Sequence, residues 1–109
     1  MLRAQSRAGL GLDFAWGIAF SLEGLARLAV EEQQPQRALV LAGAAEHRRR
    51  TVGIPLPAVG RAQMDGLLAR ARDALPEADV TAAFAHGQRL DDQALIAWLR
   101  TEQLLPSVQ

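Results

Sequence analysis

The sequence predicts an all-α protein built from antiparallel helical hairpins, with about five helices. Alanine and leucine, which favour helices, occur 21 and 17 times among the 109 residues. The β-branched and aromatic residues that favour sheets are scarce. Apolar residues recur at intervals of three and four, and prolines and glycines separate these periodic stretches. No stretch has the alternating pattern of a half-buried strand, so an all-β fold is excluded.

The composition also excludes several classes of function. Twelve arginines balance twelve acidic residues, so no broad electrostatic attraction to nucleic acid or to anionic membranes is expected. The absence of cysteine excludes disulfides, thiolate metal ligands and cysteine nucleophiles. The absence of lysine excludes a phosphate-binding loop of the Gly-Lys-Ser/Thr type. No apolar run reaches the roughly 20 residues of a membrane span, and Asp13 interrupts the stretch closest to a signal peptide, so a cytoplasmic location is expected.

The N-terminal part is expected to hold a helix remnant and then a first complete helix. Residues 1–12 contain two close glycines and are interpreted as the end of a preceding helix and a loop. Asp13 is expected to cap a helix over about 13–32. Its apolar stripe consists of Ile18, Leu22, Leu25, Ala26 and Ala29, widened by Leu28. The polar turn Glu31–Gln34 follows.

A second helix completes a hairpin over 13–52. Pro35 suits its first turn, where the missing N–H costs nothing, and Gly53 is expected to end it. Two prolines make residues 53–57 a stiff loop. The inner face of this helix is expected to consist of Ala38, Leu41, Ala42 and Ala45, with Val52.

Three further helices are expected over about 58–75, 77–88 and 92–104. Asp91 and Asp92 lie at the start of the last of them and have N-cap chemistry. The inward-facing residues are expected to be Met64, Leu67, Leu68, Ala71, Leu75, Val80, Ala83, Phe84, Leu95, Trp98 and Leu99. Connections of two to six residues favour antiparallel neighbours, and the whole chain, 1–109, is interpreted as a single domain.

The hairpin resembles a tetratricopeptide repeat, in which small residues occupy the points where helices cross. Ala38 follows Ala26 by twelve residues and Ala45 follows seven later, so small side chains recur at the crossings. Leu22 stands at the usual position of a first-helix tryptophan and Ala42 at that of a second-helix aromatic residue. An ordinary alanine-rich hairpin is therefore the alternative interpretation.

One repeat cannot bury both of its faces, and stable arrays usually have three or more units. We therefore expect the chain to be the C-terminal end of a longer array. Residues 58–104 would form a helical cap on its last repeat.

Two stretches carry a resemblance to a known family. They are SLEGLARLAVEEQQPQRALVLAGAAEHRRRTVGIPLP (21–57) and AFAHGQRLDDQALIAWL (83–99), with RAQMDGLLARARDAL between them. Together they resemble the C-terminal segment of bacterial transcriptional regulators that combine a STAND-type ATPase, a tetratricopeptide-like region and often a LuxR-type DNA-binding domain. Related segments occur in predicted ATPases associated with adenylate-cyclase-like domains. The resemblance covers about residues 10–100 and implies an interaction or signal-sensing arm.

No catalytic, cofactor or metal site is expected. His47 and His86 are the only histidines, and neither has a second metal ligand three or four residues later. Asp91 and Asp92 are most simply helix caps rather than catalytic carboxylates. We therefore expect a protein that is not an enzyme and binds no cofactor.

Five residues are candidates for contacts with a partner. Trp16 and Phe20 lie off the apolar stripe and would form a second face, for a preceding repeat or for a homodimer. Arg48, Arg49 and Arg50 form the densest positive cluster. This cluster would contact a phosphate, an acidic partner domain or RNA, or it would simply be a solvated helix C-terminus, where cations are favourable.

The expected function is a non-catalytic, protein-interaction or signal-sensing segment of a bacterial transcriptional regulator. Its partners would be other domains of the parent regulator or a separate protein, with no nucleic acid or membrane. The alternative is a small stand-alone DNA-binding protein with a helix-turn-helix in 77–104. The spacing around Gly87 favours that motif, but Gln93 stands where an apolar residue is needed, and Asp91 and Asp92 would repel phosphates.

Overall fold

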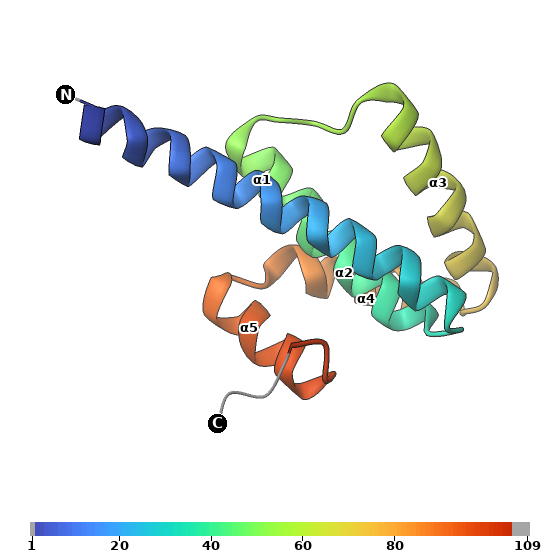
Figure 1. Cartoon of the computed structure of the whole chain (residues 1–109). Coiled ribbons are helices and arrows are strands. Elements are labelled where there is room, and N and C mark those ends of the chain that lie inside the picture. The colour runs from blue at the N-terminus through green and yellow to red at the C-terminus, as the bar shows by residue number, and fades with distance from the viewer. Residues whose placement is uncertain (1, 106–109) are drawn as a thin grey trace.

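Residues 2–105, the part of the chain that the structure describes, form five helices joined by short connections (Figure 1). The computed structural model describes the backbone of residues 2–105 and the side chains of residues 16–105. In chain order the helices are α1 (Leu2–Glu31), α2 (Pro35–Val52), α3 (Ala58–Asp73), α4 (Glu77–Arg89) and α5 (Asp92–Thr101). No strand occurs in residues 2–105, so the predicted all-α, five-helix fold is confirmed.

Proline, glycine and aspartate fix most helix ends where the sequence predicted them. Pro35 occupies the first turn of α2, and Gly53 ends it in the left-handed region, at φ 72°. The Asp91 carboxylate accepts a hydrogen bond from the Ala94 N–H at 2.7 Å and caps α5. Helix α3 ends at Asp73 and α5 at Thr101, two and three residues before the approximate ends predicted from the sequence.

The predicted start of the first helix is wrong. The backbone of α1 is helical from Leu2 onward, without the expected loop at Gly9–Gly11 and without a cap at Asp13. A glycine inside a helix costs roughly 0.5–1 kcal/mol relative to alanine, but it keeps its backbone N–H and does not block the helix as proline does. Two glycines therefore weaken this segment without ending it.

The α1–α2 hairpin packs through small side chains, as predicted. Ala26 of α1 and Ala38 of α2 are completely buried, and Ala45 is 1% exposed. Small residues at these positions let the two helix axes approach closely. The predicted inner residues Leu22, Leu41 and Ala42 are also buried, and Leu25 is half-buried.

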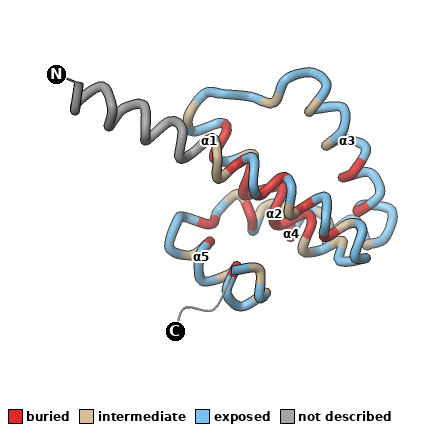
Figure 2. The backbone as a smooth tube through the Cα atoms, viewed as in Figure 1, coloured by how far each residue is buried: buried red, intermediate tan, exposed pale blue. Residues whose placement is uncertain are grey.

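Helix α2 is the centre of the molecule. Every residue from 38 to 45 is buried, including Leu39, Val40 and Ala44, which lie outside the predicted inner face (Figure 2). A helix that is apolar on all sides needs neighbours on all sides. Helix α1 covers one side of α2 and α4 covers another, and these two helices make its most extensive contacts.

The crossing of α2 with α4 brings the backbones of the two helices into close contact. A Cβ atom added to Gly43 would lie 2.2 Å from the Phe84 carbonyl oxygen, and one added to Gly87 would lie 2.0 Å from the Val40 carbonyl oxygen. Each glycine therefore faces the backbone of the other helix. The two helices run in the same direction, with α3 as the connection between them (Figure 1).

Helix α5 is joined to α2 by ion pairs at both of its ends. Arg37 Nε lies 3.1 Å from Glu102 Oε1, and Arg48 Nη2 lies 2.9 Å from Asp92 Oδ1. Arg37 and Arg48 are eleven residues apart, which is about three turns and roughly 16 Å on one face of α2. Because the earlier residue of α2 pairs with the later residue near α5, the two helices run antiparallel.

Helix α3 packs against α1, α2 and α4 through only a few residues. Only Leu67, Leu68 and Ala71 of α3 are buried. Figure 1 shows α3 standing away from the other helices, at the end of the loop 53–57. None of the helices, over the residues that the structure describes, is long and apolar enough to cross a membrane.

Candidate functional site

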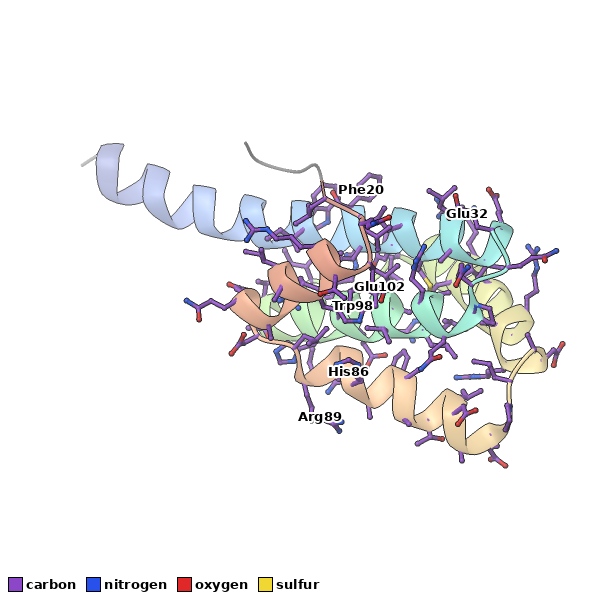
Figure 3. The ribbon with its side chains drawn as sticks, turned by 90° about the horizontal axis from the view of Figure 1, so that it is seen from below. Phe20, Glu32, His86, Arg89, Trp98 and Glu102 are labelled. Atoms are coloured by element: carbon purple, nitrogen blue, oxygen red, sulfur yellow. The ribbon has the colours of Figure 1, made fainter. Side chains whose placement is uncertain are left out.

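Trp16 and Phe20 form an exposed aromatic pair on α1. Their ring centroids are 5.3 Å apart and the planes are 8° from parallel, so the rings are stacked. The exposed fractions are 43% for Trp16 and 60% for Phe20. In Figure 3, Phe20 lies on the side of α1 that faces away from α4. The two rings lie where the sequence predicted a second apolar face, and about half of their surface is exposed.

Arg49, in contrast, is buried in the α1–α2 interface. Its Nε lies 2.5 Å and its Nη2 2.9 Å from the two carboxylate oxygens of Glu23. The remaining nitrogen, Nη1, donates to the Ile54 carbonyl at 3.2 Å. Glu23 is 6% and Arg49 5% exposed. This guanidinium joins α1, α2 and the loop after α2, because each of its three nitrogens donates a hydrogen bond within the protein.

Arg48 is also buried, at 6% exposure, on a different side of α2. Its guanidinium donates to the Ala44 carbonyl at 3.2 Å, to the Leu90 carbonyl at 3.4 Å and to Asp92 at 2.9 Å. Leu90 and Asp92 flank the connection between α4 and α5. Arg48 therefore fixes that connection against α2.

Arg50 is the one member of the cluster that lies at the surface. It pairs with Glu46 one turn earlier, and Glu46 also accepts a hydrogen bond from Gln88 Nε2 at 3.0 Å. Both sequence interpretations, a contact patch and a solvated helix end, placed all three arginines in solvent. That placement is wrong for Arg48 and Arg49, because both are buried and donate hydrogen bonds to carboxylates and carbonyls of the protein.

A cleft of about 660 Å³ lies between α1, α2, α3, α4 and the loop after α2. Arg61, Asp65 and Arg72 border it from α3, and the ion pairs Arg49–Glu23 and Arg50–Glu46 border it from the opposite side. Its apolar lining consists of Pro55, Leu56, Met64, Leu68 and Phe84. This cleft could not be predicted from the sequence, since its walls come from four separate helices and a loop.

One feature of the sequence does indicate the ion pair that borders this cleft. Glu23 stands among the apolar residues Ala19, Leu22 and Ala26 on the buried face of α1. A carboxylate on an apolar face needs a cationic partner, because burying an unpaired charge is very costly. That requirement points to an arginine of the facing helix.

The histidines provide no metal site in the described residues. His47 and His86 are both exposed, and no group of three or more His, Asp or Glu side chains gathers there to hold an ion (Figure 3). Gly87, which suggested a helix-turn-helix, lies buried against the backbone of α2.

Comparison of the chain with protein-family models, curated proteins and solved structures finds no match.

Proposed function

We propose that this chain is a non-catalytic helical interaction module that binds protein through the face of α1 carrying Trp16 and Phe20. The exposed stacked pair is the observation that carries the proposal. Aromatic side chains bury 150–250 Å² each in an interface, and tryptophan is among the residues enriched at contact hot spots. Phe20 is 60% exposed although phenylalanine has no polar group to satisfy in water.

The surroundings of the pair favour a helix as the contacting element. Gly24 lies one turn after Phe20, and the space beyond its Cα is open. Two bulky rings followed by a glycine give a ridge and an adjacent hollow along one side of α1. A second helix can place its own side chains into such a surface.

The isolated chain offers one partner for this face, a second copy of itself. Only a few large side chains are available, and interfaces much below about 1,200 Å² are weak, so a weak dimer is expected. Sedimentation velocity over a wide concentration range should show reversible self-association of the unmodified chain. The variant carrying Trp16→Ser and Phe20→Ser should remain monomeric at the same concentrations.

Val59→Ser is the matched control. Val59 is 71% exposed, more than either ring, but it lies alone at the start of α3. This variant should associate like the unmodified chain. Equal association of the double variant and the unmodified chain, or no association of the unmodified chain, would contradict the proposal.

The resemblance to C-terminal segments of bacterial transcriptional regulators supports the same role. In that setting the partner would be another domain of the regulator, and the module would be intracellular. The alternative of a DNA-binding helix-turn-helix in 77–104 gains no support from the geometry. Asp92, at the start of the would-be recognition helix, is joined to Arg48, and Arg100 is the only basic residue of α5.

A further inference from the structure

The cleft beside α3 has the make-up of a small-molecule site. Pockets that hold such ligands are typically about 300–1,000 Å³, mostly apolar, with a few polar groups that set orientation. The volume here, about 660 Å³, lies within that range. Met64 and Leu68 of α3 and Phe84 of α4 supply the apolar part. This cleft is separate from the aromatic pair on which the proposed function depends.

Two of the four arginines at the cleft, Arg49 and Arg50, already form ion pairs within the protein. Arg49 donates from all three of its nitrogens to Glu23 and Ile54, and Arg50 pairs with Glu46. Arg61 and Arg72 form no ion pair with any described residue, and both are exposed. The arginines at the cleft that form no ion pair with a described residue are therefore both on α3.

The two remaining arginines differ in their surroundings. Arg61 has Asp65 one turn later, on the same face of α3, and that carboxylate offsets its charge. Around Arg72, the positions three and four residues away are Leu68, Ala69, Leu75 and Pro76. Glu77 borders a neighbouring hollow with Arg72 but forms no ion pair with it. Among the four arginines at the cleft, Arg72 is thus the one with neither an ion pair to a described residue nor an acidic residue three or four positions away.

We propose that the cleft binds a small organic anion, with its acidic group at Arg72 and its apolar body over Met64, Leu68 and Phe84. A guanidinium pairs well with a carboxylate, because its N–H groups match the two oxygens. The apolar body excludes water from this pair and so strengthens it. Such a ligand touches both α3 and α4, and it would fix α3 against the rest of the fold.

The test uses a fluorescent acid and its neutral counterpart on the full chain. Dansylglycine has a carboxylate and an apolar ring system, and dansylglycinamide has the same body without the charge. We expect saturable enhancement and a blue shift of dansyl emission with the acid, and about fivefold weaker binding of the amide. Absence of saturable binding, or equal affinity for acid and amide, would overturn the proposal.

Variants then locate the site. Arg72→Gln should weaken dansylglycine about fivefold and leave the amide unchanged, whereas Arg100→Gln, which removes the same charge from α5, should change neither. Met64→Ser should weaken both probes. Equal effects of Arg72→Gln and Arg100→Gln would place the probe elsewhere and refute the assignment. Because Arg72 is exposed, its replacement leaves the core intact, and far-UV circular dichroism checks this.

Discussion

Gly43 of α2 and Gly87 of α4 bring the backbones of these two helices into direct contact. Each glycine faces a carbonyl of the other helix, those of Phe84 and Val40, at distances that leave no room for a methyl group. The relationship is reciprocal, since each helix contributes one glycine and one carbonyl. It explains why α2 is buried on the side opposite to α1.

Gly87→Ala should therefore destabilise the protein. The added methyl would collide with backbone, which cannot move aside as a flexible side chain does, and overpacking of this kind costs about 1–3 kcal/mol. Gly66→Ala is the matched control, because nothing lies within 4 Å of a Cβ at Gly66. That change in a helix interior should stabilise by about 0.5–1 kcal/mol. Urea denaturation measures both, and an unchanged or raised stability of Gly87→Ala would contradict the close crossing.

The alanine crossing of α1 with α2 is tested by Ala45→Leu. Ala45 is 1% exposed, so the larger side chain has to displace its neighbours, at a cost of about 1–3 kcal/mol. Ala69→Leu places the same side chain on the exposed face of α3 and should leave the melting temperature nearly unchanged. An unaltered melting temperature for Ala45→Leu would rule out a crossing at this point.

Removing one residue of the Glu23–Arg49 pair should lower the free energy of unfolding far more than replacing both residues. Glu23→Leu leaves the guanidinium buried without a counter-charge, and breaking a buried pair in this way costs about 3–5 kcal/mol. Replacing both residues by leucine should recover most of that loss, because a well-packed apolar pair often substitutes for a buried ion pair. A double-mutant cycle measured by urea denaturation gives the coupling. Additive losses would show that the two side chains do not interact.

Asp91 and Asp92 are neighbours with different roles, and their variants should differ. Asp91→Ala removes the N-cap of α5 and should cost about 0.5–2 kcal/mol. Asp92→Asn weakens an ion pair whose carboxylate is 84% exposed, and such pairs contribute less than about 1 kcal/mol. The Asp91→Ala variant should therefore have a smaller free energy of unfolding than the Asp92→Asn variant, as measured by urea denaturation. The reverse order would mean that the pair with Arg48 is stronger than its exposure implies.

The sequence predicted the helices well because the signals at their ends are local. Pro35, Gly53 and Asp91 each act on their own turn, and each ends or starts a helix as expected. The error at Gly9–Gly11 arose from treating glycine as a break, although glycine only lowers helix stability.

The ion pairs of the arginine cluster were harder to predict because their acidic partners are distant in the sequence. Arg49 pairs with Glu23, 26 residues earlier, and Arg48 with Asp92, 44 residues later. The arginine cluster alone does not reveal these partners. Trp16 and Phe20 were easier, since their offset from the apolar stripe of α1 already placed them outside the core.

The small number of buried residues in α3 has a consequence for local unfolding. Three buried residues, Leu67, Leu68 and Ala71, hold α3 to the core, so its local unfolding should require much less free energy than global unfolding. Its amide hydrogens should therefore exchange with solvent faster than those of α2, whose residues 38–45 are all buried. A bound anion that joins α3 to α4 would slow exchange in α3 first, and occupancy of the cleft would be read out as a change in protection along one helix.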